Sequence, residues 1–506
     1  MIEERIQLES LKDRIVTVEE AVSWIQDGMT IGFSGFTSSG DVKVVPRALV
    51  EHVKKVEKPL KLQLYTGASV SPEIDALLSE AGLISKRLPF QSDKVMRKKI
   101  NAGEVMYIDQ HLSNTADMIR NGSLSSIDLA VVEALQITKE GAIVPTTSGG
   151  NTAIFLQQAK EVIIELNLGQ PLALKGVHDI YDPGNMGTRK PIPLTSVDQR
   201  IGHTEIQIDP AKIKGIVLTN ILDTPKILTA PDVETEQIAT HLINFLRTEI
   251  KQGRLPNPLP PLQSGVGSVA NAVFHGFLHS EFSDLQIYSE VLQDAVFDLM
   301  DVGKIHFASG GSLTLSKEKT EEVFTHFEKY ADKIILRPQE LTNNPEIIRR
   351  LGLIAINTAL EADIYGNVNS THVMGTQIMN GIGGSADFTR NARLSIFVTK
   401  SIAKNGAISS IVPFASHIDN TEHDVQVIIT EQGVADLRGL APRERAILII
   451  NNCAHPSYRP QLMDYYERAI KQGGQTPHNL EEALSWHVRF TSTGSMQTVD
   501  SLVHSS

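Results

Sequence analysis

Residues 17–40 decide the fold class, and they read TVEEAVSWIQDGMTIGFSGFTSSG. Thr17 and Glu20 have the spacing of a capping box, and apolar residues then recur at helical intervals until Gly28 supplies a stop. The apolar run at 29–33 predicts a buried strand that opens into a loop rich in glycine and serine. The expected order is therefore a helix, a strand and a glycine loop.

The same alternation recurs along the rest of the chain. Further strand-like runs occur at 61–65, 127–132, 162–165, 285–288, 305–308, 394–398, 407–412 and 425–430. Strands that alternate with helices indicate parallel sheets covered on both faces. We therefore expect an α/β protein of two related domains, each an open, mostly parallel sheet covered by helices.

The length of the chain supports this division. Its 506 residues exceed the roughly 250 to 300 residues at which one hydrophobic core stops growing. The proline-rich segment 254–262 cannot continue a helix or a central strand, so it predicts a stiff connection near the start of the second domain. We place the domains at residues 1–227 and 228–506.

Composition excludes several classes of function. The formal charge of −12 argues against nucleic-acid binding, because phosphate backbones are held by basic patches, and any anionic ligand must meet a local positive group. A single cysteine, Cys453, excludes an internal disulfide and a cysteine metal cluster, and it fits a reducing compartment. No export signal and no run of about 18 apolar residues is visible. We expect a cytoplasmic protein with no metal site and no membrane partner.

Four segments place glycine or amide groups at or beside the end of a predicted strand. They are 263–267, 289–290, 380–385 and 430–433. Ligands of open parallel sheets bind beyond the carboxyl ends of the strands, and glycine loops there present amides to oxyanions or phosphates. A glycine pair by itself is most often only a turn. The loop after residue 33 lacks a Walker lysine and the GxGxxG spacing, which disfavours nucleotide binding.

Glu290 follows one of these strands directly. A carboxylate at this place lies where a substrate would bind, but it is equally suited to a salt bridge or to the first turn of a helix. Position alone leaves both interpretations open.

The chain resembles the acetyl-CoA hydrolase/transferase family of class I coenzyme A transferases over nearly its whole length. The stretches that carry the likeness are GFSGFT at 32–37, QSGVG at 263–267, YSEVLQD at 288–294, EADIYGNVN at 361–369 and MNGIGGS at 379–385. Several long motifs in one order make a chance similarity improbable.

The resemblance implies covalent catalysis by Glu290, which attacks the acyl-CoA thioester and then carries coenzyme A as a glutamyl thioester. A carboxylate suits this role because it is expected to be ionised at neutral pH without a partner base. The backbone amides of Val266 and Gly384 would hold the oxyanion on the glutamyl carbon, and the side-chain amide of Asn343 would serve the substrate carbonyl. Glu431 corresponds to a second active-site carboxylate.

The resemblance also implies the binding site for coenzyme A. Lys404 would meet its phosphates, Asn380 and Gly384 would line the pantetheine channel, and the loop Gln263, Ser264, Gly265, Val266 and Gly267 would contact the coenzyme. Each residue has a plainer interpretation as well: turns for the glycine loops, a helix cap for Asn343, a solvated surface position for Lys404, and an ion pair with Arg438 for Glu431.

The implied activity is transfer of coenzyme A between succinyl-CoA and acetate. The substrates would be acyl-CoA and short carboxylates, with no permanently bound cofactor, and the family suggests a homodimer. Propionate as the partner acid, hydrolysis of acetyl-CoA, and a non-catalytic acyl-CoA-binding protein remain alternatives, and an NAD-dependent enzyme rests on the fold class alone. Segment 220–225 leaves open how the acceptor carboxylate is held.

Overall fold

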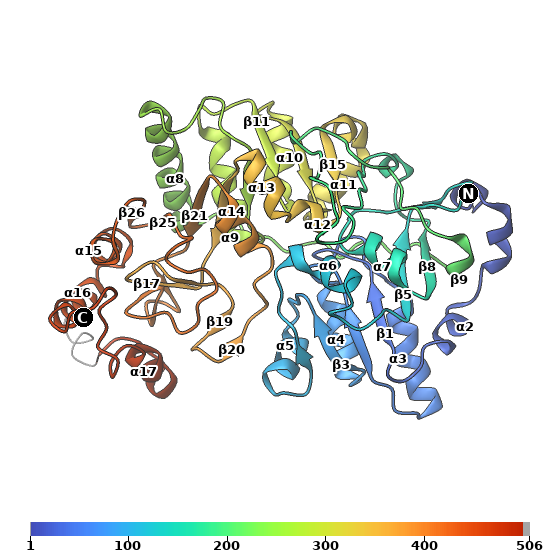
Figure 1. The fold of residues 1–506 in the computed structure, drawn as a ribbon, viewed down its shortest axis with the longest axis horizontal. Coiled ribbons are helices and arrows are strands. Elements are labelled where there is room, and N and C mark those ends of the chain that lie inside the picture. The colour runs from blue at the N-terminus through green and yellow to red at the C-terminus, as the bar shows by residue number, and fades with distance from the viewer. Residues whose placement is uncertain (1, 499–506) are drawn as a thin grey trace.

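The computed structural model describes residues 2–498, and it contains two large sheets flanked by helices. Figure 1 shows the first sheet with its helices at the right, the second sheet in the upper centre, and the C-terminal helices at the left. The predicted fold class, α/β with open and mostly parallel sheets, is confirmed.

The first sheet has seven strands in the order β4-β3-β2-β1-β5-β8-β9, and every pairing is parallel. Its strands are β1 (Thr30–Phe33), β2 (Leu62–Tyr65), β3 (Ile84–Leu88), β4 (Met106–Tyr107), β5 (Leu129–Ala134), β8 (Glu161–Asn167) and β9 (Ile213–Thr219). The accompanying helices are α2 (Val18–Ser23), α3 (Val45–Val56), α4 (Pro72–Glu80), α5 (Lys94–Asn101), α6 (Thr115–Arg120) and α7 (Thr152–Gln158). The predicted order of helix, strand and loop is found, and Thr17 Oγ1 accepts a hydrogen bond from the Glu20 amide at 3.2 Å.

The second sheet has eight strands in the order β15-β13-β11-β10-β16-β21-β25-β26, and only β25 and β26 pair antiparallel. Its strands are β10 (Leu262–Ser264), β11 (Leu285–Tyr288), β13 (Ile305–Gly310), β15 (Ile334–Leu336), β16 (Ile354–Thr358), β21 (Leu394–Val398), β25 (Val427–Thr430) and β26 (Gly433–Asp436). The helices of this part are α8 (Val233–Lys251), α9 (Ser268–His275), α10 (Asp294–Asp301), α11 (Lys317–Thr325), α12 (Gln339–Thr342), α13 (Pro345–Leu351) and α14 (Ser385–Asn391).

One predicted strand is found only in part. The run 407–412 is divided into β23 (Ile408–Ser409) and β24 (Ile411–Val412), and neither joins a large sheet. Ile411 and Val412 instead pack into a separate C-terminal core, so their apolar character reflects burial there.

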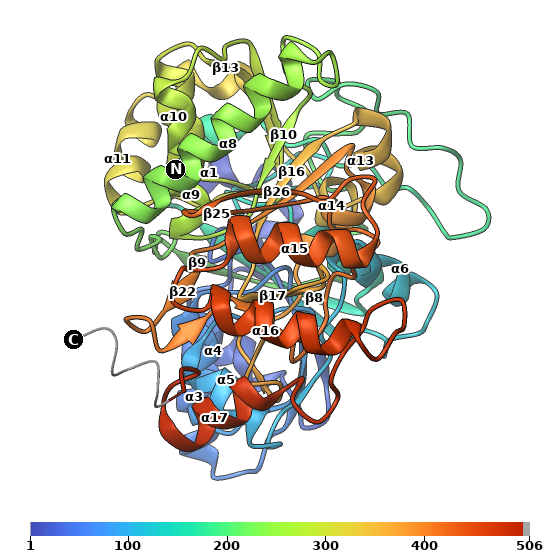
Figure 2. The ribbon, with the colours of Figure 1, turned by 90° about the vertical axis from the view of Figure 1, so that its left-hand side faces the viewer.

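The C-terminal core lies under the helices α15 (Pro442–Cys453), α16 (Arg459–Ile470) and α17 (Ser485–Thr493). Figure 2 shows these helices together on the side that faces the viewer, in front of β17 (Glu361–Asp363). Helix α17 begins at Ser485, and its Trp486 packs into this core.

The two halves of the chain interlock. Leu174 and Val177, which follow the first six strands of the first sheet, belong to the core of the second sheet, and Asp179 N donates to the Leu336 carbonyl of β15 at 2.9 Å. Segment 220–232 then crosses without regular secondary structure to α8, which packs on the second core. We keep the division between residues 227 and 228 as a proposal.

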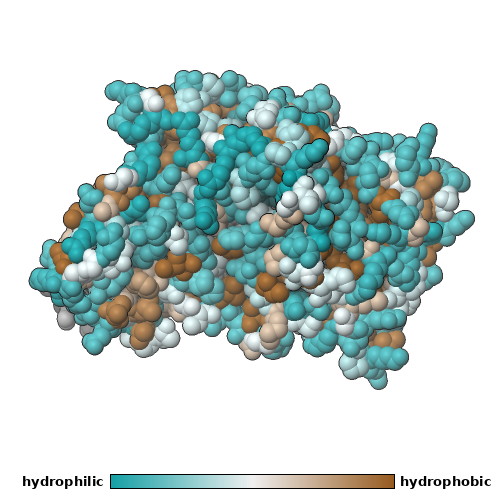
Figure 3. Space-filling model, viewed as in Figure 1, coloured by the Kyte–Doolittle hydropathy of each residue, from teal (hydrophilic) through white to brown (hydrophobic). Residues whose placement is uncertain are grey.

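The face of the molecule in Figure 3 is mainly hydrophilic, with small, scattered apolar areas. Among residues 2–498, no helix is long and apolar enough to cross a membrane.

Candidate active site

Glu290 lies immediately beyond the carboxyl end of β11, and its residue is only 6% exposed. Asn343 Nδ2 donates a hydrogen bond of 2.7 Å to Glu290 Oε1. The backbone amide of Gly384 donates to the same carboxyl group. Two donors from separate segments therefore converge on one buried carboxylate, which is the arrangement expected for a reacting acid rather than for a salt bridge.

Only glycine fits at position 384. A Cβ atom there would lie 2.0 Å from Glu290 Oε1 and 2.2 Å from Asn343 Nδ2, far inside van der Waals contact. Gly384 is the N-cap of α14, so its amide points out of the helix toward the carboxyl group. The glycine is therefore required by close approach of the backbone to Glu290.

Asn343 ends α12 and is fully buried. Thr342 Oγ1 donates to Asn343 Oδ1 at 2.8 Å, which leaves the Nδ2 group to face Glu290. Asn343 is the C-cap residue of α12, but its side chain does not cap the helix that follows, because Asn344 is the N-cap of α13 and accepts from the Glu346 amide at 3.0 Å.

The loop after β10 is braced by Gln293. Gly267 N donates to Gln293 Oε1 at 3.1 Å, and Gln293 Nε2 donates to the Gly265 carbonyl at 3.1 Å. Val266, between these two glycines, is 39% exposed, and no partner for its amide occurs within residues 2–498. Its N–H group is therefore available to a ligand.

Glu290 opens into a cavity of about 290 Å³ between the two halves of the chain. Gly265, Val266, Gly267, Asn380 and Gly384 line it, and their contact with coenzyme A stays a prediction. Residues from the first half complete the wall: Phe36, Thr37, Ala68, Ser69, Phe90, Ser92 and Leu112.

Gln263 and Ser264 stand apart from this wall. They belong to β10 and are buried, and Gln263 Nε2 donates to Asn357 Oδ1 at 3.2 Å behind the loop. Their contact with the coenzyme stays a prediction.

The first half of the chain also holds the second glycine loop in place. Arg97 Nη2 donates to Asn380 Oδ1 at 2.8 Å, and Asp109 accepts from the Ile382 amide at 2.9 Å. A Cβ atom on Gly381 would lie 2.6 Å from the Tyr107 hydroxyl, so this position also requires glycine. Such pairings between distant segments give no signal in a single sequence.

Burial changes the ionisation of Glu290. It raises the pKa of this carboxyl group from 4.5 to about 7, although the hydrogen bonds from Asn343 and Gly384 act in the opposite direction. The carboxyl group that was expected to be ionised at neutral pH is therefore only partly ionised there. Near pH 7 the protonated and ionised forms coexist, because desolvation penalises the charged form.

Lys226 is a further lining residue that the sequence analysis missed, and no other Lys or Arg within residues 2–498 lines this cavity. Burial lowers the pKa of its ammonium group, and Asp41 acts in the opposite direction. The signal available in the sequence was its position next to segment 220–225, where the grip on the acceptor carboxylate was left open. An ammonium group here supplies the local positive charge that an anionic substrate needs.

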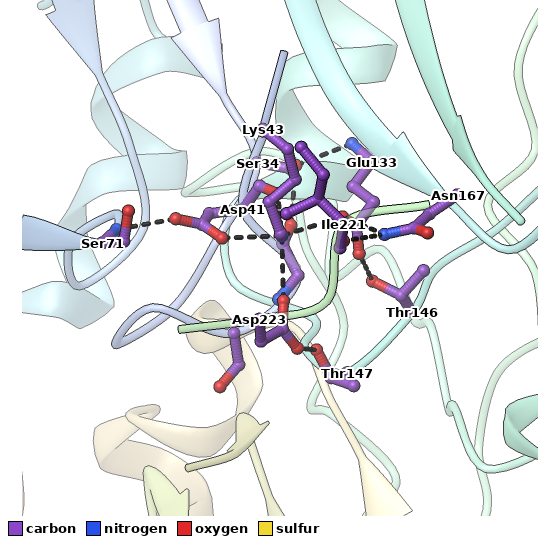
Figure 4. Close-up of polar contacts among 12 residues, drawn as sticks. Ser34, Asp41, Lys43, Ser71, Glu133, Thr146, Thr147, Asn167, Ile221 and Asp223 are labelled. Carbon is purple, nitrogen blue, oxygen red and sulfur yellow. Dashed lines mark hydrogen bonds and ion pairs between the residues drawn. The ribbon is translucent and has the colours of Figure 1, made fainter. Parts of the chain in front are cut away.

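The segment that carries Lys226 is anchored by a buried ionic network, shown in Figure 4. Lys43 Nζ lies 2.9 Å from Asp223 Oδ1, and 2.8 Å from both Glu133 Oε2 and Asp41 Oδ1. Burial lowers the pKa of Lys43, but the three carboxylates outweigh it and raise the pKa well above its ordinary value. Asp223 thus ties the crossing segment to the first sheet.

Glu431 and Lys404 are not among the residues that line the cavity. The Glu431 carboxylate accepts from the backbone amide of Ser401 at 2.8 Å and from its hydroxyl. Burial raises the pKa of Glu431, but hydrogen bonds from Ser401 and Gln432 outweigh it, so the pKa is lowered. The ion pair with Arg438 is wrong, because Arg438 binds Glu249 and Asp436.

Lys404 lies in an exposed hairpin, and its ammonium group is 4.9 Å from the ring centre of Phe490. Its contact with the phosphates of coenzyme A stays a prediction.

The fold and the site are those of a known protein family. The chain is a member of the acetyl-CoA hydrolase/transferase family: the N-terminal domain of that family matches residues 2–218, and its C-terminal domain matches residues 320–466.

Individual relatives extend over nearly the whole chain. It is 52% identical over 496 residues to the succinyl-CoA:acetate CoA-transferase of Clostridium kluyveri, which covers 98% of this chain and 92% of that protein. It is 45% identical to the propanoyl-CoA:succinate CoA transferase of Escherichia coli, over 95% of this chain and 98% of the relative. The crystal structure of RipA from Yersinia pestis has the same fold, with a TM-score of 0.72 at 22% identity, over 90% of this chain and 98% of RipA.

Proposed function

We propose that this protein is a coenzyme A transferase that moves coenzyme A between succinyl-CoA and acetate, with Glu290 as the covalent carrier. The observation that carries the proposal is the buried Glu290 carboxyl group, held by Asn343 and Gly384 in a cavity. The 52% identity to a succinyl-CoA:acetate CoA-transferase supports this pair of acids.

The reaction begins with the ionised Glu290. One carboxylate oxygen attacks the thioester carbonyl of succinyl-CoA, the carbon–sulfur bond breaks, and coenzyme A leaves as a thiolate. The product is a mixed anhydride of succinate and Glu290. The thiolate then attacks Cδ of Glu290 and expels succinate, which leaves a glutamyl-CoA thioester. Acetate reverses both steps and departs as acetyl-CoA.

Both attacks on the glutamyl carbon pass through a tetrahedral oxyanion on Glu290. The Gly384 amide and Asn343 Nδ2 already donate to this carboxyl group, and the Val266 amide is available nearby. Fixed donors of this kind contribute about 100- to 1,000-fold each to the rate in comparable sites. Because every step is an acyl transfer through a tetrahedral oxyanion, oxyanion stabilisation and positioning supply most of the catalysis.

The binding roles are also part of the proposal. Asn380 and the loop 263–267 would contact the pantetheine arm, Lys404 would meet a phosphate, and Glu431 would order the neighbouring Ser401. We further propose a homodimer in the cytoplasm, since dimers are the commonest oligomers and the buried Cys453 fits a reducing compartment.

Mass analysis tests the covalent step. After mixing with succinyl-CoA, the peptide that contains Glu290 should carry coenzyme A, and the Glu290→Ala variant should carry none. A wild-type protein that turned over with no adduct, or a Glu290→Ala variant with near-normal turnover, would remove Glu290 from the mechanism.

The requirement for a carboxylate acceptor is tested by comparing turnover of acetyl-CoA or succinyl-CoA with and without an acceptor such as acetate. Transfer requires acetate, whereas equal loss of acetyl-CoA without any acceptor would identify a hydrolase. A panel of donors that favoured propanoyl-CoA over acetyl-CoA would point instead to the activity named for the E. coli relative. Binding of acyl-CoA without a covalent adduct would support the alternative of a non-catalytic acyl-CoA-binding protein. Binding of NADH would support the alternative of an NAD-dependent enzyme.

A further inference from the structure

Asp387 lies in the first turn of α14, three residues after Gly384, and is 5% exposed. Ser113 holds it at both oxygens: Ser113 Oγ donates to Oδ1 at 2.6 Å, and Ser113 N donates to Oδ2 at 3.1 Å. The side chain of Asn343 also hydrogen-bonds to this carboxyl group. Asn343 therefore lies between two acids, Glu290 and Asp387.

The planar geometry of the Asn343 amide couples its contacts with its three neighbours. The two hydrogens of the Asn343 NH₂ group lie in one plane with its carbonyl oxygen, so the directions of all three hydrogen bonds are linked. One hydrogen is directed at Glu290 Oε1, and the carbonyl oxygen accepts from Thr342 Oγ1. An acceptor for the second hydrogen fixes the remaining direction and prevents rotation of the amide.

We propose that Asp387 is a positioning residue for the transfer reaction: it holds the Asn343 amide so that one N–H group points at the reacting carboxyl of Glu290. Within residues 2–498, Asp387 is not among the residues that line the cavity of Glu290 and makes no hydrogen bond to Glu290, so it acts through Asn343. This inference rests on the proposed function of Glu290.

Ser113 makes this positioning depend on the first half of the chain. It belongs to the short 3-10 helix Leu112–Asn114, and Leu112 lines the catalytic cavity. A series of hydrogen bonds from Ser113 to Asp387 to Asn343 therefore connects a loop of the first half of the protein to the Asn343 amide in the second half. Docking of the halves both closes the cavity and orients Asn343.

A second cavity, of about 510 Å³, provides a matched control. Asp387 lines it, and so does Asp424, whose carboxylate makes no hydrogen bond to Asn343 within the described part of the chain. Asp387→Asn and Asp424→Asn thus make the same substitution beside the same cavity, but only the first changes a group that hydrogen-bonds to Asn343.

The experiment is a double-mutant cycle on the rate at which succinyl-CoA forms the Glu290 thioester in a single turnover. Asp387→Asn should lower this rate about 10- to 100-fold, since misplacing a catalytic group by about 1 Å costs about 100-fold. The KM for succinyl-CoA should change less than twofold, and Asp424→Asn should leave both values within twofold. In an Asn343→Ala background, Asp387→Asn should have no further effect, because its route of action is gone.

Ser113→Ala removes only one hydrogen bond to Asp387 and should cause a smaller loss of the same kind, which keeps the test valid where Asp387→Asn fails to fold. An unchanged rate in a folded Asp387→Asn variant, or an equal loss with and without Asn343, would overturn the inference. Absence of the thioester in the wild-type protein would instead overturn the function on which it rests.

Discussion

Glu290→Gln should stabilise the protein while it abolishes transfer. Glutamine keeps the size of the side chain and an oxygen that accepts from Asn343, but it cannot ionise. Burial raises the pKa of Glu290 from 4.5 to about 7, so the folded state resists loss of this proton. Each whole step in pKa corresponds to about 1.4 kcal/mol, so the ionised carboxylate destabilises the fold by about 3 kcal/mol.

The gain in stability from Glu290→Gln should increase with pH, because the pKa of Glu290 is raised in the folded state. Below pH 4.5 the carboxyl group is protonated in both the folded and unfolded states, and it costs nothing. Between pH 4.5 and about 7 the unfolded state loses the proton first, so the stability of the wild-type protein falls as pH rises, and the penalty is constant above that range. The substitution should therefore have little effect at pH 5 and its full effect at pH 8.

Thermal unfolding of both proteins at pH 5 and pH 8 measures the difference. With an unfolding entropy of about 2.1 cal/mol/K per residue over 506 residues, about 3 kcal/mol raises Tm by about 3 °C at pH 8. Glu431→Gln is the control of opposite sign, because the pKa of Glu431 is lowered and its charge stabilises the fold. An equal gain in Tm at both pH values, or no gain at pH 8, would refute the reasoning.

Three further predictions concern activity. The rate of Glu290 acylation should fall as pH is lowered through about 7, since only the ionised carboxylate attacks, and a profile that stayed flat down to pH 5 would contradict the burial of its charge. Gly384→Ala should reduce transfer at least about 100-fold in a folded protein, because its Cβ would occupy the place of Glu290 Oε1, and near-normal kcat would disprove that geometry. Lys226→Met should raise the KM for acetate several-fold with little change for acetyl-CoA, whereas Lys404→Ala should raise the KM for all acyl-CoA substrates alike; exchanged effects would reverse the two assignments.

Local patterns predicted much of the fold because they record burial and backbone conformation. The strands at 61–65, 285–288 and 394–398 are found within a residue or two of their predicted bounds, since short apolar runs between turn signals are typical of strands in parallel sheets. At 407–412 the same rule predicted strand residues but not the small sheets that they join, because burial in a separate core produced the same apolar signal. Periodicity reports that a residue is buried, and it does not report against which sheet.

The sequence by itself determined the α/β class, the motifs of the family and the place of Glu290 after a strand. Tertiary structure alone decided that the Asn343 amide donates to Glu290 Oε1, that Gly384 must lack a side chain, and that Lys226 enters the cavity. It also decided that the pKa of Glu290 rises to about 7. These properties depend on distances between segments far apart in the chain and on the exclusion of water, and neither quantity exists until the two halves have packed together.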